Sequence, residues 1–218
     1  MLRILYGGTF DPVHNGHLAV ADAAARCFAT DVWLLPAADP PHRAAPGADA
    51  IARAAMLDLA IVGHPRLRVD RRELRRAGPS YTVETLHAVR AQIGESAPLA
   101  WLLGADAFAG LPQWHRWREV FALAHLIVAL RPGYALDPAV AELQAAIAGR
   151  RCSSPLELSG SAAGRWFPLS LPPQPESASE VRAGVRACAS WSEQVPAAVA
   201  AYIRSHCLYG AGAASEGS

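Results

Sequence analysis

Two glycines and two histidines stand close together in the stretch GGTFDPVHNGHL at residues 7–18. Gly7 and Gly8 lack a Cβ, so a ligand can approach the backbone there. His14 and His17 lie three positions apart and can donate hydrogen bonds to phosphate oxygens. A helix beginning beside them would aim free backbone N–H groups at the same anion. The stretch therefore predicts a phosphate site, and the alternative is a turn before a capped helix with surface histidines.

Two further motifs carry side chains that suit a nucleotide. PPHR at residues 40–43 would form a stiff loop, and the guanidinium fork of Arg43, next to His42, matches phosphate geometry. Asp106 follows an apolar run, and its carboxylate can accept from two ribose hydroxyls at once. The alternatives are a solvated proline loop and an ordinary helix cap.

Aromatic and polar residues also stand at the ends of later predicted elements. Trp114 offers a flat face to an aromatic ring, whereas we assign Trp117 to the core. Tyr81 and Thr82 open a predicted helix, for which Ser80 is another candidate cap. A core position for Trp114 and an ordinary helix start for Tyr81 and Thr82 remain the alternatives.

The elements that would position these residues alternate along the chain. Apolar runs predict strands at 2–6, 31–36, within 67–74, and at 99–104, 124–131 and 166–171. Helical patterns occupy 17–29, 49–62, 81–93, 137–148, 178–188 and 196–206, and Asp49 is a candidate N-cap. This rhythm predicts an α/β fold, Rossmann-like and doubly wound, with a mostly parallel sheet and helices on both faces.

Ligands of such folds bind beyond the carboxyl ends of the strands. That rule brings four segments to one rim, at residues 7–18, 36–43, 104–114 and 131–134. Arg131 follows a strand within the last of them, and it either faces the site or braces it. The topology thus gathers the candidate residues at one edge of the sheet.

Length and composition suit one domain at residues 1–209, with a small polar tail at 210–218 that we expect to be disordered. The net charge is +1, so no overall field favours nucleic acid or a membrane as partner. Six arginines within 66–76 are interrupted by acids, which is typical of a solvated surface. Oligomeric state is left open, and a homo-oligomer is compatible with the sequence.

Cysteine usage indicates a reducing compartment. The four cysteines form no CxxC pair and no zinc-type cluster with histidine, so we expect free thiols and no protein-bound metal. No stretch resembles a signal peptide, and the apolar runs are short of a membrane span. We therefore expect a cytoplasmic protein.

The residues at 7–18 resemble the (T/H)xGH signature of the nucleotidyltransferase superfamily. Across nearly all of 1–209 the chain is similar to bacterial nicotinate-nucleotide adenylyltransferases. The first motif is shared by several adenylyl- and cytidylyltransferases, whereas PPHR, PSYT and the GAD…W pair are more specific. The matching pieces are GGTFDPVHNGHL, PPHR, RREL…PSYT, GAD, PQW, AHLIV…RPGY and SASEVR.

This resemblance implies a binding role for each matching residue. On the ATP side it implies Gly7, Gly8, Thr9, Phe10, His14, His17, Gly104, Asp106, Ser177, Ser179 and Arg182. On the side of nicotinate mononucleotide it implies His42, Arg43, Tyr81, Thr82, Trp114 and Arg131. Asp106 would contact the adenosine ribose, and Trp114 would stack on the pyridine ring. His17 is the expected main catalytic residue, with His14 and Arg182 beside it.

The SASEVR segment departs from the ISSTxIR pattern of that family. Glu176 replaces the usual leading apolar residue, and Glu180 occupies a position that is often apolar. A carboxylate near a triphosphate would repel it unless the carboxylate faced solvent. The departure weakens the assignment of Ser177 and Ser179 more than that of Arg182, and a capped surface helix is the alternative.

The implied reaction is adenylyl transfer from ATP to nicotinate mononucleotide, giving deamido-NAD and pyrophosphate in NAD biosynthesis. The attacking phosphate is already an anion, so no general base is needed, and Mg²⁺ would travel mainly on the ATP phosphates. The helix start at Thr82 would favour a ring carboxylate over a neutral amide.

Other readings of the same residues remain. One is the same chemistry with nicotinamide mononucleotide as acceptor, and phosphopantetheine fits a ring-binding pocket poorly. Another is a nucleotide-binding module without turnover, which would not need both histidines. A dinucleotide oxidoreductase is disfavoured because the GxGxxG fingerprint is absent from the sequence.

Overall fold

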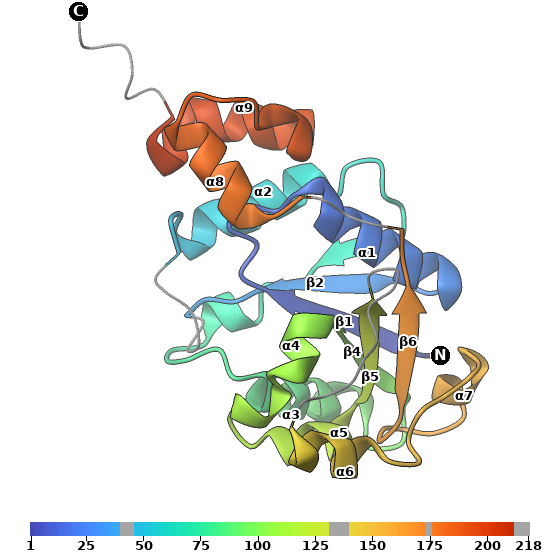
Figure 1. Ribbon diagram of the computed structural model, residues 1–218. Coiled ribbons are helices and arrows are strands. Elements are labelled where there is room, and N and C mark those ends of the chain that lie inside the picture. The colour runs from blue at the N-terminus through green and yellow to red at the C-terminus, as the bar shows by residue number, and fades with distance from the viewer. Residues whose placement is uncertain (40–45, 131–139, 173–175, 212–218) are drawn as a thin grey trace, which may run out of the picture.

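The computed structural model describes residues 1–39, 46–130, 140–172 and 176–211. Its strands are β1 (Arg3–Gly8), β2 (Val32–Pro36), β3 (Leu67–Val69), β4 (Leu99–Gly104), β5 (His125–Leu130) and β6 (Trp166–Ser170). The described strands form a six-stranded sheet in the order β3-β2-β1-β4-β5-β6, and all neighbours run parallel (Figure 1). This is the doubly wound order, so the predicted fold class is confirmed.

Helices cover both faces of the sheet (Figure 1). They are α1 (Asn15–Cys27), α2 (Ala50–Ala60), α3 (Thr82–Ile93), α4 (Ala105–Ala109), α5 (Trp117–Leu123), α6 (Ala141–Ile147), α7 (Leu156–Ser159), α8 (Ala178–Arg186) and α9 (Ala197–Ser205). Helices α1, α2, α8 and α9 contribute to one hydrophobic core, and α3, α4, α5 and α6 to the other. The sheet therefore separates two apolar layers.

Alternation along the strands explains why there are two cores. Successive side chains of a strand point to opposite faces of the sheet. In β1, Ile4 joins the core under α1 and α2, whereas Leu5 joins the core under α3 and α5. In β4, Leu102 and Leu103 divide in the same way. All four are at most 3% exposed, which explains why both strands read as continuous apolar runs.

The predicted elements agree with the described ones to within a few residues, apart from the start of the helix at 137–148, where 137–139 lie outside the described residues. Asp49 caps α2 as expected, because its carboxylate accepts from Ala52 N at 2.7 Å. The expected cap of α3 is wrong, since Tyr81 is the N-cap and no side chain caps this helix. Ser80 Oγ instead accepts from Ala38 N at 3.0 Å and joins the loop after β2 to the start of α3.

Short elements were not predicted. The segment 104–114 contains α4 and the 3₁₀ turn η2 (Leu111–Gln113), and α5 and α7 were also missed. Within the arginine-rich segment 66–76, Arg68, Arg71 and Arg72 form ion pairs with acidic side chains on partly exposed surface. The expectation of a solvated, charged face holds for Arg68 and Arg71, whereas the Arg72–Asp70 pair is largely buried.

The end of the described chain packs against the body of the protein. Tyr209 lies in the 3₁₀ turn η4 (Leu208–Gly210) and is 8% exposed. Gly210 closes that turn, so the predicted tail begins inside an ordered element, and residues 212–218 lie outside the described ones. Among the described helices, none has the length and apolar character to cross a membrane.

Candidate active site

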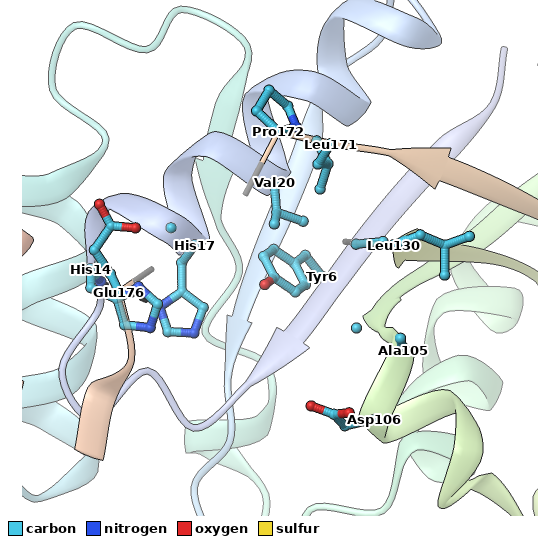
Figure 2. A pocket seen from close by; sticks show the side chains of 13 residues that line it. Tyr6, His14, His17, Val20, Ala105, Asp106, Leu130, Leu171, Pro172 and Glu176 are labelled. Atoms are coloured by element: carbon cyan, nitrogen blue, oxygen red, sulfur yellow. Dashed lines mark hydrogen bonds between the residues drawn. The ribbon is translucent and has the colours of Figure 1, made fainter. Parts of the chain in front are cut away.

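A pocket opens at the carboxyl ends of β1, β4 and β5, where the strand order reverses (Figure 2). One wall is the first two turns of α1, and the opposite wall is the start of α4. A third side comes from the chain after β6. The described residues that line the pocket as a whole are Tyr6, His14, Gly16, His17, Val20, Gly104, Ala105, Asp106, Ala129, Leu130, Leu171, Pro172 and Glu176. The pocket thus lies on the rim that the sequence predicted.

The two histidines are held together at the start of α1. His14 is the N-cap, and its ring centroid lies 3.6 Å from that of His17. His14 N donates to His17 Nδ1 at 3.3 Å, which assigns the ring proton of a neutral His17 to Nε2. Burial lowers the pKa of His14 to about 4, so this ring is uncharged at neutral pH. Its buried Nδ1 has no hydrogen-bond partner in the described structure.

Aromatic packing fixes the orientation of His17. Phe10 is 2% exposed, and its ring lies edge-on to His17 with centroids 5.0 Å apart. Tyr6 contacts both rings, with its centroid 5.5 Å from that of Phe10 and 6.3 Å from that of His17. The side chain of Phe10 therefore packs against the His17 ring and restricts its orientation. Thr9, which precedes Phe10, accepts a hydrogen bond from Arg53 through its backbone carbonyl.

The two glycines of β1 lie against aromatic side chains inside the protein. A Cβ placed on Gly7 would overlap the Trp101 ring, and one on Gly8 would lie in tight contact with the Phe10 ring at 3.0 Å. Close ligand approach was the expected reason for these glycines. The structure adds an internal reason, which is the room taken by two large aromatic side chains, and ligand approach at these glycines stays a prediction.

Asp11 anchors the loop between β1 and α1. Its carboxylate accepts from Gly47 N at 2.8 Å, from Ala48 N at 3.1 Å and from the Tyr209 hydroxyl at 2.8 Å. Arg182 Nη1 donates to the backbone oxygen of Asp11 at 2.5 Å. The loop that carries His14 is therefore tied to the segment before α2, to α8 and to η4.

Arg53 is a second brace under the same loop. This guanidinium is 0% exposed, and burial lowers its pKa, with Asp11 nearby acting in the opposite sense. It donates to Thr9 O at 2.6 Å, Ala48 O at 3.1 Å and Ala38 O at 3.3 Å. Sequence reasoning missed both Asp11 and Arg53. The signal available in the sequence was Arg53, a charged residue on the apolar face of the helix predicted at 49–62.

Asp106 and Gly104 lie across the pocket from the histidines. Both are exposed, and Asp106 belongs to the first turn of α4 (Figure 2). No atom lies within 4 Å of a Cβ built on Gly104, so this strand end is open. A carboxylate on one wall and two adjacent imidazoles on the other can hold the two ends of a nucleotide: hydroxyls at Asp106 and phosphates at α1.

Comparison with known proteins identifies the family. A sequence model of the cytidylyltransferase-like family matches residues 5–184. A protein of Stenotrophomonas maltophilia named "Probable nicotinate-nucleotide adenylyltransferase" is 52% identical, over 95% of this chain and 96% of its own length. The chain belongs to this family. A relative of the same name in Xylella fastidiosa is 45% identical, over 96% of each chain.

Solved structures of the family share the fold. Nicotinic acid mononucleotide adenylyltransferase of Plasmodium falciparum, complexed with NaAD, superposes with a TM-score of 0.72 at 14% identity, covering 97% of this chain and 98% of that one. The same protein complexed with APC gives a TM-score of 0.71 at 15% identity, with the same coverage. At this identity the likeness concerns the fold.

The predicted acceptor residues do not line this pocket. The Tyr81 ring lies 4.4 Å from the ring of His115, the neighbour of Trp114 in sequence, and Trp114 is partly buried against the α3–α5 core. Thr82 is the first residue of α3. The Tyr81–His115 contact joins the start of α3 to the segment that follows η2. His42, Arg43 and Arg131 lie outside the described residues.

The predicted triphosphate residues of α8 also stand outside the pocket lining. Ser177 caps α8 and accepts from Glu180 N at 3.2 Å, while Ser179 Oγ accepts from Arg182 Nη2 at 3.4 Å. Arg182 is turned toward Asp11. The residue of this segment that does line the pocket is Glu176, which the family pattern did not anticipate.

Proposed function

We propose that this member of the nicotinate-nucleotide adenylyltransferase family transfers the adenylyl group of ATP to nicotinate mononucleotide, forming deamido-NAD and pyrophosphate. The observation that carries the proposal is the pocket in which His14 and His17 begin a helix opposite Asp106 at the switch point of the sheet. The names of its full-length relatives support the same reaction. The chain is thus an enzyme of NAD biosynthesis.

The chemistry is an in-line displacement at the α-phosphorus. An oxygen of the acceptor phosphate bonds to the α-phosphorus as the bond to the bridging oxygen of pyrophosphate breaks, and that oxygen leaves with the electron pair. Because the nucleophile is an anion, no residue has to remove a proton. His17 Nε2–H and the first amides of α1 stabilise charge on the α- and β-phosphates as it develops.

Positioning is the second contribution of the protein. We assign the ATP ribose to Asp106 and Gly104, and the phosphates to the loop from Gly7 to His17. Arg182, with Ser177 and Ser179, would close on the triphosphate from α8. Holding both substrates in line replaces a bimolecular encounter by an intramolecular one, which contributes several kcal/mol, up to about 11, to the barrier reduction.

Mg²⁺ would enter this site bound to the phosphates of ATP. Among the described residues no group of three histidine, cysteine or acidic side chains is placed to hold a metal ion. The pocket offers Asp106 and the buried, unpaired Oε2 of Glu176 as single carboxylate ligands. Bound with ATP, the ion would neutralise charge on the leaving pyrophosphate, with most of its ligands from phosphates and water.

The acceptor site is the finer part of the proposal. We place the pyridine ring between Tyr81 and Trp114, with the phosphate near His42, Arg43 and Arg131. The first turn of α3, opened by Thr82, favours a ring carboxylate by its positive end. The reaction is proposed to take place in the cytoplasm, in keeping with four unpaired cysteines. Nucleic acid and membranes have no part in it.

The test is pyrophosphate release from ATP and Mg²⁺ with three alternative acceptors. We expect rapid release with nicotinate mononucleotide, much slower release with nicotinamide mononucleotide, and none with phosphopantetheine. A preference for the amide would contradict the carboxylate assignment at Thr82 while keeping the chemistry. A protein that binds ATP but releases no pyrophosphate with any acceptor would be a binding module instead.

A further inference from the structure

Glu176 points its carboxylate at the first turn of α1, inside the pocket (Figure 2). Its Oε2 atom is buried without a hydrogen-bond partner in the described structure. A Cβ built on Gly16 would lie 3.3 Å from this oxygen and 3.1 Å from His14 Nδ1, which is also buried and unpaired. The carboxylate, the imidazole and the helix start thus meet at one point.

Little positive charge offsets this carboxylate. His14 is uncharged because burial lowers its pKa to about 4. Asp106, on the opposite wall, adds a second negative charge, and no lysine or arginine is among the described lining residues. Arg182, from the same motif, donates to Asp11 and Ser179 instead. Within the described part of the pocket, the positive end of α1 is the favourable partner that remains for Glu176.

A polyphosphate bound at α1 would have to share this position with Glu176. Two anions at one helix start repel strongly in a partly buried site, whereas a divalent cation between them attracts both. Here the inference rests on the proposed function, which places ATP phosphates at this helix. We propose that Glu176 is a specificity-determining residue that makes the site select metal-complexed ATP and reject free ATP.

Glu180 provides a matched control on the same segment. It lies in the first turn of α8, four residues after Glu176, is exposed and is not among the described residues that line the pocket. Removing its charge changes the net charge of the protein by the same amount as removing that of Glu176. A long-range effect of net charge on ATP binding would therefore appear in both variants. A local effect would appear in the Glu176 variant alone.

The measurement is the dissociation constant of ATP by titration calorimetry, without acceptor, once with excess Mg²⁺ and once with EDTA. The quantity compared is the ratio of the metal-free to the metal-bound constant. For Glu176→Gln we expect this ratio to fall by on the order of tenfold relative to the unmodified protein. For Glu180→Gln we expect no change beyond about twofold. Inorganic tripolyphosphate, titrated in the same way, should reproduce the difference without the adenosine.

Each outcome decides between the alternatives. An unchanged ratio in Glu176→Gln, or an equal fall in Glu180→Gln, overturns the inference and leaves the proposed function intact. Failure of the unmodified protein to bind ATP even with Mg²⁺ overturns the proposed function, and the inference with it. Glu176→Met, which also removes the charge, gives the same reading if the glutamine variant does not fold, as judged by circular dichroism.

Discussion

His17 is oriented by a backbone contact and by packing against aromatic rings. His14 N occupies its Nδ1, and Phe10 packs against its ring edge, so the Nε2–H direction is fixed before any substrate arrives. A donor fixed in this way loses no freedom during the reaction, and such donors typically contribute about 10²–10³ in rate.

His17→Ala should therefore lower kcat by about 10²–10³ with little change in melting temperature. His17→Asn, which keeps an N–H donor on a shorter side chain, should retain more of the activity than the alanine variant. Steady-state pyrophosphate release and thermal unfolding measure the two effects. Near-normal turnover in a folded His17→Ala protein would exclude His17 as the main catalytic group.

His14 makes stability depend on pH. Its pKa is about 4 in the folded protein and about 6.5 when unfolded, so between these values the unfolded chain binds a proton that the folded chain does not. The free energy of unfolding should fall by about 3 kcal/mol from this group as pH drops from about 6.5 to about 4.

His14→Asn removes this contribution and serves as the comparison. Chemical unfolding at pH 7 and pH 4.5 should show a smaller loss of stability in the variant than in the unmodified protein. His125 is also buried, and burial lowers its pKa, so it contributes equally to both proteins and cancels in the difference. Equal losses in the two proteins would contradict the assignment of a neutral, buried His14.

Among the elements, the three-residue 3₁₀ turn η4 helps to position the catalytic loop. It brings the Tyr209 hydroxyl to Asp11, whose carboxylate also receives two backbone N–H groups. Burial raises the pKa of Tyr209, so this hydroxyl remains a donor at any working pH. The turn thereby anchors the loop that carries the histidines.

Tyr209→Phe should cost about 1.5–3 kcal/mol of unfolding free energy, as expected for a hydrogen bond to a charged acceptor. It should also lower kcat more than it raises KM for ATP, because the loop loses its exact position while the pocket remains. Tyr202→Phe, on the neighbouring helix α9, is the control and should change neither. A loss of stability with unaltered kcat would show that Tyr209 is merely structural.

How much the sequence predicted depended on the size of the element. The strand at 99–104 was predicted because it is buried on both faces of the sheet and therefore apolar. The start of α2 was predicted because Asp49 is a typical N-cap residue. The five-residue α4 was missed because so short a helix shows no hydrophobic period. The histidine pair was predictable from a contiguous motif.

The braces of the site were beyond local reasoning. Arg53 lies 44 positions from Thr9, and Glu176 lies far along the chain from the α1 turn that it faces. Contacts at such separations depend on the finished topology, which no local pattern encodes. The sequence left open where the two carboxylates of this motif point; in the structure Glu180 is exposed, whereas Glu176 faces the pocket.

At the scale of the whole molecule, the contact between Asp11 and Tyr209 joins residues that are 198 positions apart. A ribosome adding about 5–20 residues per second needs about 10–40 s to travel between them. The strand β1 and the two histidines of the loop are therefore synthesised long before their anchor has been translated. We therefore expect the loop that carries the histidines to reach its final position only after codon 209 has been translated, so that a chain cut short just before this codon is less stable and less active.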